Sequence, residues 1–360
     1  MAGGSILGTR VERKEDPKFL TTGGVYVDDL DEELLAGAAH VAYARSAVAH
    51  GTITSIDVEG AKEMPGVIGV FTAADLELQP VPSQFNPTVA RTLLASDKVR
   101  FVGEPVVAVV AETLAQATDA AEMVFVDVDF LPAHVDIEGS LASDSLIYDA
   151  AGSNGVFDTT AIGMPDNTPA EEYFADCEVT ATGRFLNQRV APCPLEVRGS
   201  AATWVDGRLF QWLSTQHAQG VKVPIAAANG VDDDVVRVIA PDVGGAFGAK
   251  IGTYAEEMLL GVLAKAIGRP VRWRETRSES MMAMGHGRGQ LQYATIGGTR
   301  DGRVTHFQLH LLQDCGAFAD VGTVLPMAFG RPMAAGVYDI ANIEVRATSV
   351  VTNTTPTVPY

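Results

Sequence analysis

The segment 244–248, Gly-Gly-Ala-Phe-Gly, is the part of the sequence best suited to bind a ligand through its backbone. Because glycine has no side chain, the N–H groups of such a turn can approach an anion or a metal-bound oxygen closely. The segment lacks the G-x-G-x-x-G spacing of dinucleotide folds, and Lys250 is followed by Ile251 rather than by the Ser or Thr of a P-loop. Both phosphate-binding fingerprints are therefore absent. The alternative interpretation is a tight strand-to-helix connection with Phe247 packed in the core.

Such a turn needs rigid elements on both sides. Residues 235–239 (VVRVI) predict a strand, and residues 254–267 predict a helix whose apolar positions fall on one face. Gly268 and Pro270 are typical helix-ending residues. The spacing of apolar residues changes from a strand pattern to a helical pattern here. This change predicts that the glycine turn connects the strand to the helix and is exposed toward a pocket.

Further elements are predicted in the same half of the chain. Residues 177–190 and 208–213 are strand candidates. A helix is expected over 218–228, with Gly230 as the residue that stops it.

The first half also mixes strands and helices. Residues 67–71 predict a buried strand. Residues 104–129 combine an apolar strand with a helix that opens on the capping-box spacing of Thr113 and Gln116, and an alternating strand follows at 124–130. This order is typical of a βαβ or split-βαβ unit, so the chain is predicted to have an α+β fold.

Motifs spread over nearly the whole chain resemble those of one family. They are RKEDPKFLT at 13–21 with YVDD at 26–29, VGEPV at 102–106, NQR at 187–189 with PLE at 194–196 and RG at 198–199, STQ at 214–216, and GGAFGAK at 244–250. Together they resemble the molybdopterin-binding large subunit of the molybdenum hydroxylases, which include xanthine dehydrogenase, aldehyde oxidase and aerobic carbon monoxide dehydrogenase. The VGEPV motif resembles the signature of the family's hammerhead domain.

The resemblance implies a site around molybdopterin, in its cytosine dinucleotide form, with molybdenum. Gln216 aligns with a glutamine whose amide reaches an oxygen ligand of the metal, and Phe247 aligns with a phenylalanine beside the metal. An amide donates a hydrogen bond without adding charge, and a glycine turn offers unobstructed N–H groups. Taken alone, Gln216 is more simply a polar residue at a helix start that faces water. The catalytic residues implied are Gln216 and Phe247, and the cofactor-binding residues implied are Gln216, Gly244, Gly245, Ala246, Phe247 and Gly248, with no side chain that ligates the metal directly.

Two departures from the family's pattern bear on the substrate and the chemistry. Ile251 stands where purine-oxidising members resemble one another in having a substrate-binding glutamate, and its side chain forms no hydrogen bonds. The chain also ends at 353–360, the lead-in to the family's next active-site loop, before the glutamate that acts as the family's base. Residues 355–360 resemble the loop form without the cysteine that carbon monoxide oxidation needs.

No residue in the sequence is predicted to replace that base. Glu256 and Glu257 lie in the helix after the turn, where carboxylates are expected to be solvated rather than catalytic. His217 is expected to be a polar residue at a helix start rather than a proton carrier. Cys315 is expected to pack as a small apolar residue.

Composition excludes several classes of partner. The chain has 26 Lys and Arg against 45 Asp and Glu, a formal net charge of −19, so nucleic acid and anionic membrane surfaces are poor partners. The three cysteines lack the spacing of a disulfide framework, a structural zinc or an iron–sulfur cluster. The N-terminus has no apolar core of a signal peptide, and no apolar run is long enough to insert into a membrane. A cytoplasmic location is expected.

Domain boundaries follow from the resemblance and from composition. We expect an N-terminal arm at 1–20, a hammerhead domain at 21–137 and a linker at 138–175, which is rich in Ser, Asp, Gly, Thr and Pro. The first molybdopterin-binding domain is expected at 176–360 and is expected to be incomplete at its C-terminus.

The resemblance implies oxidation of an aldehyde, an N-heterocycle or carbon monoxide, with water as the oxygen source. Electrons are expected to leave through a separate iron–sulfur small subunit and an FAD-binding medium subunit, since neither a cluster spacing nor a flavin fingerprint is present. The chain alone is not expected to turn over substrate. One alternative is a fragment of the same fold that binds partners or cofactor without chemistry. Another is an NAD- or FAD-linked dehydrogenase, which the absent G-x-G-x-x-G disfavours.

Overall fold

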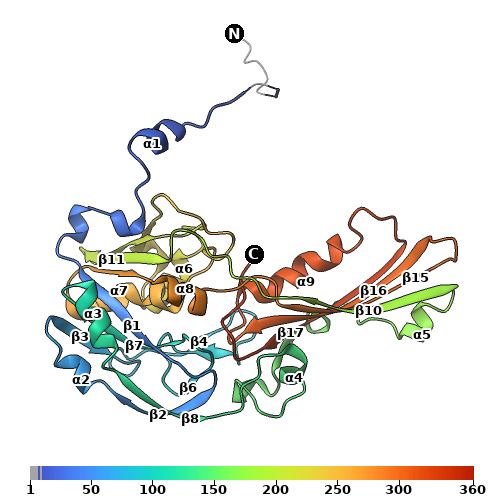
Figure 1. Cartoon of the computed structure of the whole chain (residues 1–360), viewed down its shortest axis with the longest axis horizontal. Helices are drawn as coiled ribbons and strands as arrows, with labels where there is room; N and C mark the ends of the chain where they lie inside the picture. Colours follow the sequence, from blue (N-terminus) through green and yellow to red (C-terminus); the bar gives the residue numbers. More distant parts are fainter. Residues whose placement is uncertain (1–6, 9) are drawn as a thin grey trace.

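Two β-sheets organise the chain, one inside the main body and one that projects from it (Figure 1). The computed structural model describes residues 7, 8 and 10–360. The body contains a seven-stranded sheet in the order β13-β12-β11-β14-β1-β7-β3. Its strands are β1 (Ala39–Arg45), β3 (Val67–Phe71), β7 (Pro105–Ala111), β11 (Gly199–Val205), β12 (Arg208–Leu213), β13 (Val236–Ile239) and β14 (Val271–Arg274). Because β1 pairs in parallel with β14, the two halves of the chain share one sheet.

Helices cover both faces of this sheet. The strand β7 is buried along its whole length, and its successive side chains point to opposite faces. Val107 and Val109 pack in the same cluster as Ala120 of α3 (Leu114–Ala121), whereas Ala108 and Val110 share a cluster with α7 (Ala255–Ile267). Because helices pack on both faces of the sheet, β7 is apolar along its whole length.

Smaller sheets and helices complete the body. A three-stranded sheet has the order β6-β2-β8, and a two-stranded sheet pairs β4 with β5. The strands are β2 (Gly51–Asp57), β4 (Val81–Pro82), β5 (Ala90–Arg91), β6 (Lys98–Val99) and β8 (Phe125–Phe130). The helices are α1 (Asp16–Thr21), α2 (Glu59–Lys62), α6 (Lys222–Ala228) and α8 (Arg277–Ala283).

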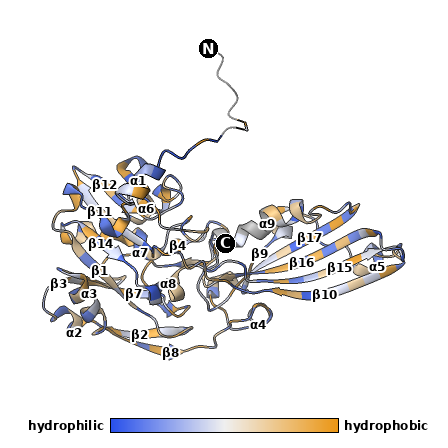
Figure 2. Ribbon diagram, turned by 45° about the horizontal axis from the view of Figure 1, so that its top comes forward, coloured by the Kyte–Doolittle hydropathy of each residue, from blue (hydrophilic) through white to orange (hydrophobic). Residues whose placement is uncertain are grey.

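The projecting sheet, called the wing below, has the order β10-β15-β16-β17-β9. Its strands are β9 (Gly155–Asp158), β10 (Val179–Asn187), β15 (Gln290–Gly298), β16 (Val304–Gly316) and β17 (Asn342–Val351). The parallel pair β16–β17 is connected by the crossover helix α9 (Val321–Met333), as parallel strands require. Hydropathy alternates along the wing strands (Figure 2), the pattern of a sheet with unlike faces.

The segment 138–175 is folded, although its composition predicts a linker. It contributes β9 to the edge of the wing and carries α4 (Ile137–Leu141) and α5 (Ala170–Tyr173) at its two ends. The buried side chain of Asn154 explains part of this order, since its amide donates to the carbonyls of Ser140 and Ser145. Polar side chains in this segment can thus hydrogen-bond to backbone groups of the protein rather than to water.

Most element boundaries agree with the sequence prediction. The strand before the glycine turn and the helix after it are confirmed as β13 and α7. The helix predicted over 218–228 begins only at Lys222, because Pro224 lacks an N–H group and is tolerated only in a first turn. The strand predicted over 177–190 is shorter, as β10 shows.

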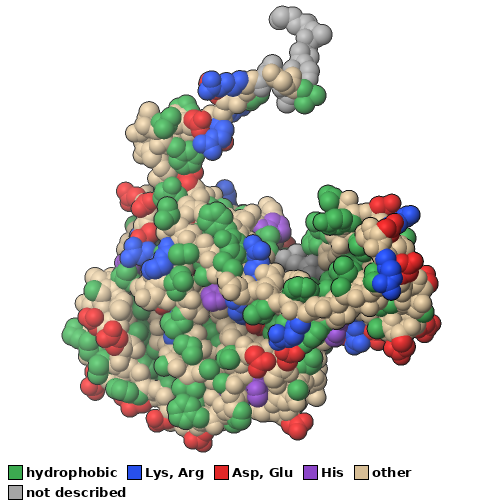
Figure 3. All heavy atoms as spheres, turned by 45° about the vertical axis from the view of Figure 1, so that its right-hand side comes forward, with side chains coloured by type: hydrophobic (Ala, Val, Ile, Leu, Met, Phe, Trp, Pro, Cys, Tyr) green, Lys and Arg blue, Asp and Glu red, His purple; other side chains and the backbone are tan. Residues whose placement is uncertain are grey.

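The surface is predominantly acidic in character. Figure 3 shows acidic side chains over the body and gathered at the tip of the wing, in keeping with the net charge of −19. In the part of the chain described, no helix has both the length and the apolar character needed to span a membrane.

Candidate functional site

The topology brings Gln216 next to the glycine turn. The strands β12 and β13 are parallel neighbours, so the segments that follow them leave the same edge of the sheet. Gln216 Oε1 accepts a hydrogen bond from the Gly248 N–H at 2.9 Å, and the Gln216 N–H donates to the Lys250 carbonyl at 2.8 Å. Phe247 directly precedes Gly248 in the chain. Phe247 and Gln216 are therefore close enough to border the same small-molecule pocket. With Oε1 engaged, the exposed Gln216 amide has Nε2 left to donate.

A buried cation fixes the base of the turn. Lys250 is 1% exposed, and its Nζ lies 2.9 Å from the Glu196 carbonyl oxygen, 3.0 Å from Glu196 Oε2 and 2.9 Å from Ser214 Oγ. Glu196 Oε2 also accepts from the Gly244 N–H at 2.7 Å. Burial lowers the pKa of Lys250, although the Glu196 carboxylate opposes that shift. The two ends of the turn are thereby tied to the end of β12.

The backbone of the turn is shaped as a cradle. Gly245, Phe247 and Gly248 have φ values of +100°, +52° and +86°, in the left-handed region that favours glycine. Within the described residues, the N–H groups of Gly245, Ala246 and Phe247 have no acceptor, whereas that of Gly248 is already bound to Gln216. The cradle therefore offers three consecutive N–H groups without a protein acceptor. The N–H groups of Gly244 and Gly248, which the resemblance implies as cofactor-binding residues, are instead bound to Glu196 and Gln216.

Phe247 is not a core residue. Its side chain is 57% exposed, and its ring meets Tyr360 edge-on with centroids 6.4 Å apart. The interpretation of the turn as a plain connection with Phe247 as its packing plug is therefore wrong. An exposed aromatic ring beside three free donors is instead suited to cover a ligand.

Glycines from distant segments surround the segment 355–360, a feature that the sequence did not reveal. A Cβ atom on Gly248 would lie 1.3 Å from the Pro359 carbonyl oxygen, and one on Gly316 would lie 2.1 Å from the Thr355 carbonyl oxygen. The other glycines that leave room for this segment are Gly285, Gly287 and Gly322. Since these contacts are far apart in sequence, no local spacing could have indicated them.

A cavity of about 430 Å³ adjoins the site. His217 and Ile251 connect it to Gln216 and to the turn, and Met258 and Phe318 add apolar walls. Arg91, from the small β4–β5 sheet, also lines it, with its guanidinium 4.4 Å above the Phe318 ring. The cavity is thus a largely apolar space of small-molecule size beside the cradle.

Known protein families match both parts of the chain. Residues 148–360 match the molybdopterin cofactor-binding domain, and residues 21–132 match the a/b hammerhead domain of aldehyde oxidase and xanthine dehydrogenase. The chain belongs to the molybdenum hydroxylase family. The α+β architecture, a hammerhead domain followed by a molybdenum-cofactor-binding domain, is confirmed by this match and by the solved structures below.

Individual molybdenum hydroxylases are similar over nearly all of the chain. The nicotine 6-hydroxylase large subunit of Paenarthrobacter nicotinovorans is 35% identical over 98% of this chain and 44% of its own length. The carbon monoxide dehydrogenase large chain of Hydrogenophaga pseudoflava is 31% identical over 95% of this chain and 44% of its own length. Quinoline 2-oxidoreductase from Pseudomonas putida 86 superposes with a TM-score of 0.89 at 34% identity, over 98% of this chain and 45% of its own. The chain spans less than half the length of these molybdenum hydroxylases.

The structure corrects one prediction about charged residues near the candidate site. Glu256 and Glu257 are not solvated, being only 3% and 2% exposed. Glu256 pairs with Arg45 at 2.7 Å and with Arg198 at 3.3 Å, because the first turn of α7 faces the body rather than water. Burial opposes ionisation of Glu256, but the two guanidinium groups outweigh it and lower its pKa to about 2.

Two other predictions can be judged directly. Cys315 is fully buried in an apolar cluster, as expected, and burial raises the pKa of its thiol to about 12. His217 is exposed and precedes α6 by a short turn, where its ring lines the cavity.

Glu257 gives the molybdenum hydroxylase chain a testable dependence of stability on pH. Burial raises its pKa to about 8 from the ordinary 4.5, although Arg198 opposes this shift. The folded state therefore binds the Glu257 proton more tightly than the unfolded state does. The resulting gain in stability is fully present below pH 4.5 and is lost as pH rises through 8. Glu257→Gln keeps an oxygen for the Tyr254 N–H, which now donates to Glu257 at 3.0 Å. We expect the melting temperature of the variant, relative to the unchanged chain, to rise between pH 6 and pH 9.

Glu256→Gln is the matched control because it lies next to Glu257 in the same helix. Since the pKa of Glu256 is lowered, the stability it provides is lost only as pH falls from 4.5 toward 2. Its melting-temperature difference should therefore change far less between pH 6 and pH 9 than that of Glu257→Gln, because Glu256 affects the pKa of Glu257 less than burial does. A Glu257→Gln variant with an equally flat difference would contradict the assignment of a protonated Glu257.

Proposed function

We propose that this chain is the cofactor-binding part of the large, catalytic subunit of a molybdenum hydroxylase that hydroxylates an apolar N-heterocycle. The observation that carries the proposal is the hydrogen bond between Gln216 Oε1 and the Gly248 N–H, which fixes the amide beside the cradle. An aldehyde and carbon monoxide are the other substrates open to this family. Water is the proposed oxygen source.

The residues of the cradle fit an oxygen-rich cofactor. The N–H groups of Gly245, Ala246 and Phe247 lack acceptors among the described residues, and the Gln216 amide adds a further donor without adding charge. These groups would hold molybdopterin, proposed here in its cytosine dinucleotide form, with molybdenum. When bound, the cofactor supplies the two-electron oxidation of the substrate.

The protein's own groups perform binding and positioning. Lys250 and Glu196 hold the turn in place from below, so the donors need no rearrangement to meet the cofactor. The Phe247 ring stands exposed at the rim, where it can restrict water near the reacting groups. Glu256 and Glu257 take no part as a base, since both are buried among Arg45, Arg198 and Tyr254.

The walls of the cavity support an apolar substrate. Ile251 presents an alkyl surface where purine-oxidising relatives have a glutamate, so the hydrogen-bonding edge of a purine would lose its partner there. Two similar proteins are named for N-heterocycles, nicotine and quinoline. Ile251 disfavours a purine, and the two names favour an apolar N-heterocycle as the substrate.

Partner subunits complete the proposed enzyme. Similar proteins are named as a large subunit, a large chain and a subunit gamma of a dehydrogenase complex. We propose that an iron–sulfur small subunit and an FAD-binding medium subunit carry the electrons away. The three cysteines are free thiols, which is consistent with the proposed cytoplasmic location.

Replacement of Gln216 tests the proposal most directly. In the complex purified from its host, Gln216→Ala should lower the turnover of quinoline or nicotine by ~10²-fold, since a positioned donor stabilises developing charge. Molybdenum content and melting temperature should stay nearly unchanged, because an exposed amide contributes only ~1 kcal/mol of net hydrogen bonding. Turnover, metal content and melting temperature are measured on the same preparations.

Gln219→Ala is the matched control. Gln219 is exposed on the same short segment, and it forms no side-chain hydrogen bond within the described chain. Its replacement should change none of the three measurements. Full turnover in a molybdenum-loaded Gln216→Ala complex would remove this residue from the site, and a native complex without molybdenum would refute the proposed function.

A further inference from the structure

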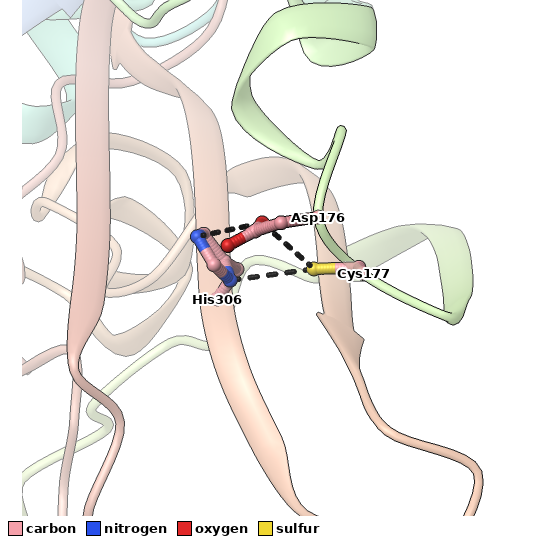
Figure 4. Close-up of side chains that lie close together, drawn as sticks. All are labelled: Asp176, Cys177 and His306. Carbon is pink, nitrogen blue, oxygen red and sulfur yellow. Dashed lines mark hydrogen bonds and ion pairs between the residues drawn. The ribbon is translucent and has the colours of Figure 1, made fainter.

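Three side chains with metal-binding atoms converge beside β16 (Figure 4), in the wing and not in the sheet that carries the glycine turn. Cys177 Sγ lies 3.3 Å from His306 Nδ1 and 3.9 Å from Asp176 Oδ1, and His306 Nε2 lies 3.6 Å from the same carboxylate. One ligand atom from each residue falls within 4.8 Å of the other two. We infer that Asp176, Cys177 and His306 form a zinc-binding site that fastens the start of β10 to β16.

The two distances from the Cys177 sulfur match tetrahedral coordination. Zinc lies about 2.3 Å from a thiolate and about 2.0–2.1 Å from an imidazole nitrogen or a carboxylate oxygen, so neighbouring ligand atoms are about 3.5 Å apart. The sulfur–nitrogen and sulfur–oxygen distances, 3.3 and 3.9 Å, lie on either side of that value. A thiolate, an imidazole and a carboxylate form a ligand set typical of zinc, whereas magnesium and calcium prefer oxygen alone.

The surroundings make room for the thiol and orient the imidazole. A Cβ atom on Gly297, the residue paired with His306 on β15, would lie 2.7 Å from the Cys177 sulfur. The His306 ring is 8% exposed and stands edge-on to Tyr173 with centroids 5.2 Å apart. The Asn342 Nδ2 atom lies 3.0 Å from His306 Nε2 and donates to the Thr305 carbonyl oxygen at 3.4 Å. With the amide turned so that its oxygen faces Nε2–H, Nδ1 becomes free to ligate the metal.

The fourth position is left for water. Asp176 is exposed, so the site opens to solvent on that side. Thr305 Oγ1, at 2.9 Å from Nδ1 and 4.0 Å from the sulfur, borders the same space and can hydrogen-bond to such a water. Three protein ligands with one open position are a common zinc arrangement.

The site has a structural consequence for the wing. The strand β10 is at the edge of the sheet, and Asp176 and Cys177 immediately precede it. A metal bound to these residues and to His306 on β16 would hold the edge strand across β15, and metal binding would add to the stability of the wing. The sequence predicts no structural zinc because Cys177 and His306 are distant in the chain and meet only through the pairing of β10, β15 and β16.

Cobalt titration of the chain tests the site, since Co²⁺ substitutes for zinc and absorbs light. We expect one Co²⁺ per chain, with a thiolate-to-cobalt charge-transfer band and the intense visible bands of tetrahedral cobalt. Zinc should displace the cobalt and raise the melting temperature. Cys177→Ser should abolish the charge-transfer band, and His306→Gln should abolish tight binding.

Two further variants make the result specific. Cys193→Ser is the matched control, because Cys193 is an exposed thiol outside the site and its replacement should leave the cobalt spectrum unchanged. Asn342→Ala removes only the partner of the imidazole and should weaken binding by ~10–100-fold. A native chain without the charge-transfer band, or a band that survives Cys177→Ser, would show that these side chains form only hydrogen bonds. Neither outcome depends on the molybdenum site, whose residues lie elsewhere.

Discussion

Gly248→Ala is expected to destabilise the chain by ~3–5 kcal/mol, because the new methyl group would meet backbone that cannot rotate away. The added Cβ atom would lie 1.3 Å from the Pro359 carbonyl oxygen. The φ of +86° at this position adds strain for any residue with a side chain. Either the segment 355–360 must move or the turn must open, and an opened turn loses the hydrogen bond from Gly248 to Gln216. We therefore expect a lower midpoint of chemical unfolding and loss of molybdenum from the purified complex.

Gly252→Ala is the matched control for this substitution. Gly252 lies four residues further along the same connection, and a Cβ atom added there would have open space around it. Its φ lies outside the left-handed region, so alanine should be tolerated within ~0.5 kcal/mol. If Gly248→Ala unfolds at the same denaturant concentration as Gly252→Ala, the packing of the turn against 355–360 is not as the structure shows.

Local patterns predicted the elements around the site. The run 235–239 and the amphipathic stretch 254–267 carry their own period and stop signals, so β13 and α7 could be predicted without knowledge of the fold. The helix predicted over 218–228 begins later, at Lys222, because Pro224 lacks an N–H group and is tolerated only in the first turn. The missing N–H group of this proline decides where the helix begins, and the spacing of apolar residues does not.

Contacts between distant segments could not be predicted in the same way. The Gly248–Pro359 approach and the burial of Glu256 depend on which strands become neighbours, and no spacing in the sequence encodes that. The composition of the segment 138–175 predicts a linker because polar residues are typical of loops, yet Asn154 uses its polar groups inside the fold. Composition describes what a residue can bind, and the topology determines whether the partner is water or protein.

Arg198→Met is expected to cost ~3–5 kcal/mol of stability, because it leaves a buried carboxylate without its cation. Arg198 is fully buried and lies 2.7 Å from Glu275 and 3.3 Å from Glu256. Its guanidinium also stands 4.0 Å above the Tyr254 ring, at the start of α7. Glu256 retains Arg45 when Arg198 is removed, so Glu275 becomes the unpaired charge. The midpoint of chemical unfolding is the measurement.

Two further variants test whether the loss of stability comes from the buried charge or from the removal of any arginine. Arg274→Met removes an exposed pair with Asp28, which should cost only ~0–1 kcal/mol because water screens both groups. The double variant Arg198→Met with Glu275→Gln removes the orphaned carboxylate, so it should unfold at a higher denaturant concentration than Arg198→Met alone. A double variant less stable than Arg198→Met would mean that packing around the guanidinium, rather than its charge, supports this part of the body.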